Sequence, residues 1–213
     1  TIDGQPIGKV NFVLRDSRNR LWLTISTRIV NWMQAIAPGI ADGYIALADE
    51  RGLRIVADGF AFTNEIRLDA REEWMYVVET TAQRISRMRV QPDGSLTHRE
   101  VFGPSKLGPA GFPDGIALDA LGNVWGTLVM SDILFAITPE GDYVELLEDG
   151  DAAASGNIIA TKAWVNAASF AFMDDLRLGR RDPNTRPSIL RRACRDSLRC
   201  RHHARRRRWR QRN

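Results

Sequence analysis

The stretch Asp114-Gly-Ile-Ala-Leu-Asp119 decides the fold, because its pattern occurs twice more in the chain. The earlier copies read Asn64-Glu-Ile-Arg-Leu-Asp69 and Asn11-Phe-Val-Leu-Arg-Asp16. In each copy Asn or Asp stands five residues before an Asp, and a strand-like segment with a tryptophan follows: Trp22, Trp74 and Trp125. Asp69 follows Asp16 by 53 residues, and Asp119 follows Asp69 by 50. A period of this length is typical of repeat architectures such as propellers.

The second half of each repeat also reads as short strands joined by tight turns. Alternating runs flank turns that end in glycine, at 44–56, 85–101 and 134–147. Glycine suits such turns because it adopts positive φ at low steric cost. No amphipathic helix of three or more turns is expected before residue 150. The sequence therefore predicts an all-β fold, a β-propeller with four strands per blade, with a β-sandwich of coincidental spacing as the alternative.

The chain is too short for a closed ring. Residues 1–176 supply about three and a half repeats, hence about three to four blades, whereas a propeller closes with roughly four to eight. An open arc leaves strand edges and blade faces exposed. We therefore expect residues 1–176 to be a partial propeller domain that is either a fragment or is completed by another copy. The start at Thr1 favours a fragment.

Residues 177–213 have a different composition. They hold 15 Arg and two acidic residues, whereas residues 1–176 hold 15 basic and 24 acidic side chains. The net charge of +4 is therefore the sum of +13 in the tail and −9 in the rest of the chain. We interpret this tail as an out-of-frame or mispredicted end, and we do not expect it to bind nucleic acid. The alternative is a basic arm that binds nucleic acid or anionic membrane through charge alone.

Other whole-chain features exclude several classes of protein. The two cysteines, Cys194 and Cys200, make no disulfide framework and lack the further ligands of a zinc site. No run of 18 apolar residues is present, so no membrane span is expected. Because no signal peptide precedes Thr1, the expected location is the cytoplasm.

Three motifs resemble one known family. Residues 111–125 look like its "G-x-PDG-x-x-x-D-x-x-GN-x-W" segment, residues 62–80 its "PNG" and "LYV-x-(D/E)T" segments, and residues 11–22 its first such segment. The family is that of gluconolactonase, senescence marker protein and luciferin-regenerating enzyme, and the resemblance covers about residues 1–150. It implies a six-bladed propeller with a divalent metal, usually Ca²⁺, at one end of the channel, with Zn²⁺, Mn²⁺ or Mg²⁺ as alternatives.

Equivalent positions in successive blades should converge on one rim of the channel. Asn11, Asn64 and Asp114 are such positions, and their oxygens would suit a hard cation. The resemblance implies that Asn64 and Asp114 bind the metal, that Asp114 is also the catalytic base, and that Asn11 and Lys9 bind substrate. It also implies a glutamate ligand from a blade that would precede residue 1. The expected activity is metal-dependent hydrolysis of a sugar lactone or similar cyclic ester.

Departures from the family pattern keep other interpretations open. Phe12 and Val13 replace Asp-Gly, and Glu65 replaces the glycine after Asn64. The alternatives are a non-catalytic propeller that binds a partner, or an inactive truncated fragment. Any landmark Asn or Asp could simply form a turn, and Asp16, Asp69 and Asp119 are read as turn carboxylates and the three tryptophans as packing residues. Trp32 and Met33 are expected in an inter-strand insertion with buried aromatics, with a pocket mouth as the alternative.

Overall fold

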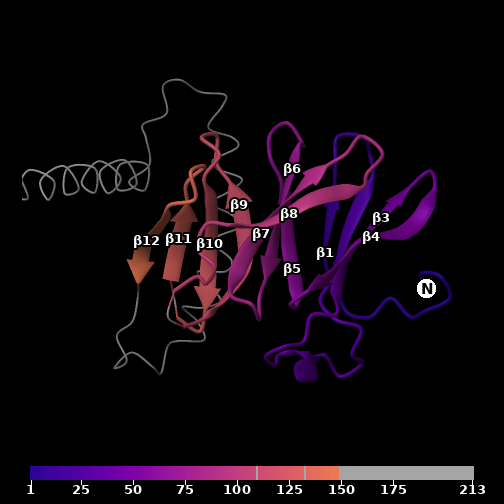
Figure 1. The fold of residues 1–213 in the computed structure, drawn as a ribbon, viewed down its shortest axis with the longest axis horizontal. Coiled ribbons are helices and arrows are strands. Elements are labelled where there is room, and N and C mark those ends of the chain that lie inside the picture. Colours follow the sequence, from indigo (N-terminus) through magenta and orange to yellow (C-terminus); the bar gives the residue numbers. More distant parts are fainter. Residues whose placement is uncertain (109, 132, 149–213) are drawn as a thin grey trace, which may run out of the picture. The chain divides into compact units, whose positions relative to one another are not determined.

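A computed structural model describes residues 1–108, 110–131 and 133–148, which form three four-stranded antiparallel sheets (Figure 1). Each sheet takes four consecutive strands: β1 (Val10–Arg15), β2 (Leu21–Ile25), β3 (Gly43–Asp49) and β4 (Gly52–Phe60); β5 (Thr63–Leu68), β6 (Trp74–Glu79), β7 (Arg84–Val90) and β8 (Leu96–Phe102); β9 (Phe112–Leu118), β10 (Val124–Val129), β11 (Ile133–Ile137) and β12 (Tyr143–Glu148). Among the described residues the only helix is a single 3₁₀ turn, η1 (Trp32–Ala35). The all-β prediction is confirmed.

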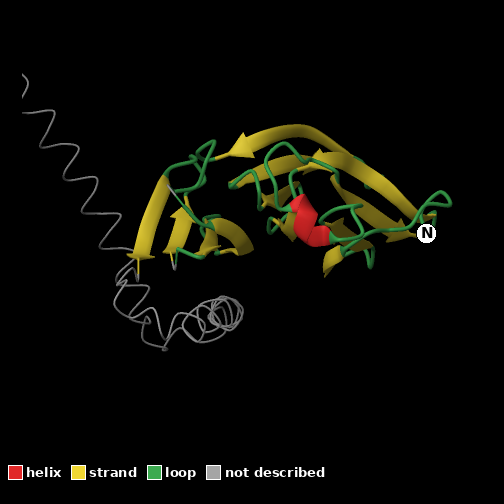
Figure 2. Cartoon of the chain, turned by 90° about the horizontal axis from the view of Figure 1, so that it is seen from below, coloured by secondary structure: helices red, strands yellow, loops and turns green. Residues whose placement is uncertain are grey.

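Each sheet is a simple meander, and the sheets follow one another in chain order. The strand order is β1-β2-β3-β4 in the first sheet, and the other two repeat it. The first strands of neighbouring sheets contact each other, β1 with β5 and β5 with β9. Viewed from below, the sheets follow one another along an arc (Figure 2). These are blades of a propeller, three in the part of the chain that the structure describes, and the predicted boundary at residue 176 and the Arg-rich tail lie outside it.

Apolar side chains fill the two layers between the blades. Between the first and second blades, Trp22, Leu47, Phe60 and Ile66 are fully buried with their neighbours. A second cluster between the second and third blades centres on Phe135 and its surroundings. The period-2 alternation of β6 supplies one side-chain row to each layer, because Met75 and Val77 belong to one cluster and Tyr76 and Val78 to the other.

The landmark aspartates are turn carboxylates, as predicted. Asp16 accepts hydrogen bonds from the backbone N–H groups of Arg18 and Arg20, from the Arg20 guanidinium and from Trp22 Nε1 at 2.9 Å. Asp119 accepts an equivalent bond from Trp125 Nε1 at 3.0 Å. Each carboxylate therefore closes the turn between the first two strands and satisfies the indole that packs in the blade.

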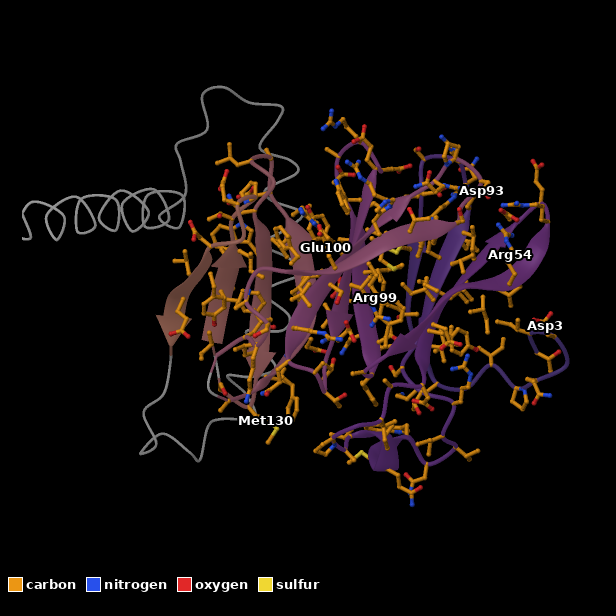
Figure 3. The ribbon with its side chains drawn as sticks, viewed as in Figure 1. Asp3, Arg54, Asp93, Arg99, Glu100 and Met130 are labelled. Atoms are coloured by element: carbon orange, nitrogen blue, oxygen red, sulfur yellow. The ribbon has the colours of Figure 1, made fainter. Side chains whose placement is uncertain are left out.

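Glu79 holds the connection between the first two blades. Its side chain is inaccessible to solvent and accepts bonds from Arg84, from Arg99 at 3.0 Å and from the backbone N–H of Ala61. Arg99 also donates to the carbonyls of Asp58 and Gly59, at the end of the first blade (Figure 3). Burial would raise the pKa of Glu79, but the hydrogen bonds from Arg84 and Ser86 outweigh it and hold the pKa below its usual value.

Replacing Asp16 by alanine should destabilise the protein by about 3 kcal/mol, because it leaves the buried indole N–H of Trp22 and two turn N–H groups without an acceptor. Chemical denaturation of the full chain, followed by tryptophan fluorescence, measures the loss. Asp69→Ala is the matched control. The Asp69 carboxylate accepts bonds from the backbone N–H groups of Glu73 and Trp74, and about 1 kcal/mol should be lost. Equal losses would contradict the role given to the indole bond.

The same carboxylate should make stability depend on pH in the acid range. Burial opposes ionisation of Asp16, but bonds from Trp22 and Arg20 leave its pKa below the usual 3.8. Its contribution is therefore complete above the unfolded pKa of about 3.9 and is lost as the pH falls through the lower folded value. Asp16→Ala should accordingly lose less stability than the wild type between pH 5 and pH 2, a range of about three units that includes that pKa.

Candidate functional site

Two landmark residues, fifty positions apart in sequence, meet at one point. Asn64 lies near the start of β5 and Asp114 near the start of β9, and Asn64 Nδ2 donates to Asp114 Oδ1 at 2.7 Å. Asn64 is only 8% exposed, whereas Asp114 is half-buried. The geometric prediction that these side chains share one end of the blades is confirmed. Their roles as ligands and base stay predictions.

Hydroxyl groups that the sequence reasoning missed hold the landmark amides. Thr80 Oγ1 accepts a bond from Asn64 Nδ2 at 3.1 Å and donates to the carbonyl of Pro113 at 2.9 Å. Asn11 Nδ2 donates to Ser26 Oγ at 3.0 Å, and that hydroxyl donates to the carbonyl of Thr63. Ser26 and Thr80 directly follow the second strand of their blades. This shared register was visible in the sequence and would have identified both residues.

Asn11 occupies the equivalent place in the first blade, but its partners differ. It is exposed, and its amide bonds Ser26 of its own blade. Because Ser26 in turn reaches the backbone of β5, Asn11 is linked to the residue before Asn64. The structure thus brings Asn64 and Asp114 into direct contact and links Asn11 to them through one hydroxyl and one carbonyl.

Beside Asn64, a buried ion pair fills the place of the glycine that the family pattern would have. Glu65 is 3% exposed, pairs with the guanidinium of Arg67 and accepts the backbone N–H of Ile116 at 3.2 Å. Burial raises the pKa of Glu65 to about 7 against the opposing effect of Arg67, and the charge of Asp114 acts in the same direction as burial. Arg67 also lies over the ring of Phe12, 4.7 Å from its centroid. Glu65 and Phe12 are two of the positions where the sequence departs from the family pattern.

Lys9 lies against the insertion between β2 and β3. Its Nζ is 4.9 Å from the centroid of the Trp32 ring, which is also 6.2 Å from the ring of Phe62. The expectation that the aromatic residues of this insertion are buried is wrong, since Trp32 is 38% and Met33 57% exposed. The reason is that η1 stands on a loop outside the sheets and buries only Ala35.

The donor set fits a hard cation. An amide and a carboxylate offer oxygen ligands, which Ca²⁺ and Mg²⁺ prefer, and the tips of Asn64 and Asp114 are within contact distance of each other. A rotation of the Asn64 amide would turn its oxygen toward the carboxylate. Among the described residues, no group of three or more His, Cys, Asp or Glu side chains is arranged so that it could hold a metal ion.

Comparison with known proteins identifies the fold. The family described as "SMP-30/Gluconolactonase/LRE-like region" matches residues 3–163. A luciferin-regenerating enzyme superposes with a TM-score of 0.55 at 18% identity, over 65% of this chain and 45% of that one. A calcium-binding regucalcin from Agrobacterium tumefaciens gives 0.53 at 21% identity, over 63% and 43%. A gluconolactonase from Xanthomonas campestris gives 0.54 at 19% identity, over 68% and 48%.

The chain spans less than half of the length of these three structures. At this identity the likeness shows the fold and leaves the reaction to be tested. No curated protein sequence matches significantly. Within the part of the chain that the structure describes, no helix is long and apolar enough to cross a membrane.

The Glu65–Arg67 pair should be strongly coupled. Arg67→Met leaves the buried Glu65 carboxylate without its cation and should cost about 3 kcal/mol of unfolding free energy. Adding Glu65→Gln removes the uncompensated charge, so the double variant should recover most of the loss. Urea titrations of the three variants measure the coupling.

An exposed ion pair provides the control for this cycle. Arg71 and Glu73 are 3.8 Å apart with side chains 78% and 46% exposed, so Arg71→Met should change stability by less than about 0.5 kcal/mol. If the double variant were as unstable as Arg67→Met alone, the cost would come from lost packing on Phe12, and the buried charge would not explain it.

Proposed function

Because the chain belongs to the SMP-30/gluconolactonase/LRE-like family, we propose that it is part of a metal-dependent hydrolase that opens a sugar lactone or similar cyclic ester. The supporting observation is the contact between Asn64 and Asp114, 2.7 Å apart and contributed by two different blades. A half-buried carboxylate oriented by an amide, at the open end of the blades, suits proton transfer from water. Turn formation alone would not require the two side chains to meet.

In the proposed reaction Asp114 acts as general base. Its carboxylate takes a proton from a water molecule as the water oxygen bonds to the lactone carbonyl carbon. The ring C–O bond then breaks, and the proton passes to the departing alkoxide, which gives a hydroxy acid. Asn64 and Thr80 hold Asp114 and its strand in place. Asn11 and Lys9 bind the substrate, and the ammonium of Lys9 stabilises negative charge on the carbonyl oxygen.

A divalent cation, Ca²⁺ from the hardness of the donors, would be held by Asn64 and Asp114 and would supply Lewis-acid polarisation of the carbonyl. The groups around Asn64 and Asp114 determine how these two side chains are held. Thr80 fixes the Asn64 amide from one side, whereas the carboxylate of Glu65 on the next position of β5 is taken up by Arg67 and the N–H of Ile116. The likeness to a protein described as calcium-binding supports the choice of ion.

Asp114→Asn should reduce lactone hydrolysis at least about 100-fold, because the amide cannot accept the proton of water. The fold should persist, since the amide oxygen still accepts the bond from Asn64. Initial rates on δ-valerolactone with added Ca²⁺, followed in a pH-stat, measure the effect. Glu140→Gln is the control, because Glu140 is exposed on the turn between β11 and β12 of the same blade, and it should leave the rate unchanged.

Removal of the metal tests the metal requirement separately from the hydrolysis of a lactone. A chelator should abolish hydrolysis, and Ca²⁺ should restore it; direct calorimetric titration should show Ca²⁺ binding that is weakened at least about tenfold in Asn64→Ala. Hydrolysis unaffected by chelator would contradict the metal requirement. Calcium binding without hydrolysis of any lactone would instead favour the non-catalytic binding module.

A further inference from the structure

One loop of the first blade exposes a group of large apolar side chains. The loop is residues 26–42, between β2 and β3, and the group, here called the lip, is Val30 (101% exposed), Trp32 (38%), Met33 (57%) and Ile36 (40%). Single exposed apolar residues are common, but four within seven positions mark a binding surface. The loop is well anchored, because Thr27 Oγ1 and the Arg28 N–H both bond the carboxylate of Asp42.

The lip borders the candidate site. Trp32 touches Lys9 and Phe62, which stand two positions before Asn11 and Asn64. The indole therefore packs against the two segments that lead into the landmark residues Asn11 and Asn64. In Figure 1 the loop lies beyond the ends of the first two sheets, at the bottom of the view. Met130, which is 69% exposed, is labelled at the same end of the third blade (Figure 3).

Trp32 is held so that part of its surface remains available to a ligand. The Lys9 ammonium sits 4.9 Å from the ring centroid, and Phe62, itself 6% exposed, packs against the ring at an interplanar angle of 52°. A cation over an indole is favourable and restrains both groups. The arrangement places an ammonium directly beside an exposed apolar surface, which suits a ligand with a polar head and an apolar substituent.

We propose that the lip binds an apolar substituent of the substrate, so that the preferred substrates are alkyl- or acyl-substituted lactones rather than polyhydroxylated ones. The lactone half of this inference rests on the proposed function. The hydroxyl groups of a sugar ring would lose water against Trp32, Met33 and Ile36 without gaining hydrogen bonds, which is unfavourable. An alkyl chain would instead gain by covering the same surface. Trp32 is then the residue that determines specificity.

Binding of lactams tests the inference without requiring turnover. The full 213-residue chain is titrated calorimetrically with δ-valerolactam and its 6-alkyl derivatives, which have the lactone shape but resist hydrolysis. Each added methylene should tighten binding about two- to fourfold until the lip is covered. Trp32→Ser should weaken the 6-pentyl lactam at least about tenfold and leave the unsubstituted lactam unchanged.

Two further variants keep the comparison interpretable. Leu121→Ser removes an apolar side chain that is 79% exposed on the turn between β9 and β10, and it should not alter lactam binding. Met33→Ser should also weaken binding of the 6-pentyl lactam, and this variant replaces Trp32→Ser in the test if Trp32→Ser fails to fold. Circular dichroism melts of each variant establish that the fold is retained.

The outcomes separate the inference from the proposed function. The proposed role of the lip is overturned if the lactam affinity does not depend on chain length, or if it is unchanged in Trp32→Ser and Met33→Ser. It is also overturned if these variants alter self-association alone. Lactams that bind through Trp32 while the matching 6-alkyl lactones are not hydrolysed would leave the lip standing and refute the hydrolase. If lactones were hydrolysed equally well at every chain length, the hydrolase would stand and the role of the lip would be refuted.

Discussion

The contact of β1 with β5 and of β5 with β9 is the constraint on which the rest of the structure depends. Each of these strands is the first of its meander, so the contact forces equivalent positions of successive blades to the same level. Asn64 and Asp114 meet for this reason, although 50 residues separate them. The apolar layers between blades supply the stabilisation, and the polar residues at the strand starts take their positions from it.

Position along the repeat decides what a carboxylate does. Asp16 and Asp119 directly follow the first strand of their blades, where backbone N–H groups and an indole donate to them, so they close turns. Asp114 begins such a strand and is half-buried beside an amide, so it remains available for chemistry. Glu79 is the last residue of β6, the second strand of its blade, and it is paired with Arg84 and Arg99. It therefore stabilises the connection between the first two blades. Four acidic side chains thus have three different roles because they occupy three different places.

The sequence predicted what the repeat determines and missed what depends on single contacts. The spacing of Asp16, Asp69 and Asp119 predicted the blades, their turns and the meeting of Asn64 with Asp114. The Glu65–Arg67 pair follows the two-residue period of a strand, but the bond from the N–H of Ile116 to Glu65 depends on how β9 lies against β5 and could not be predicted. The exposure of Trp32 was missed for a similar reason: an irregular loop has no period, so its burial depends on tertiary contacts alone.

The first blade has a long insertion between its second and third strands, where the other two described blades have a short connection. Residues 26–42 join β2 to β3, whereas residues 80–83 and 130–132 make the equivalent connections in the other blades. A hairpin needs only two to five residues, so the extra length is not required to join the strands. Ser26, at its start, orients Asn11, and Trp32, further along, contacts Lys9 and Phe62. One insertion therefore supplies both a polar support for Asn11 and an exposed apolar surface beside Lys9 and Phe62, and it does so outside the strands that position Asp114.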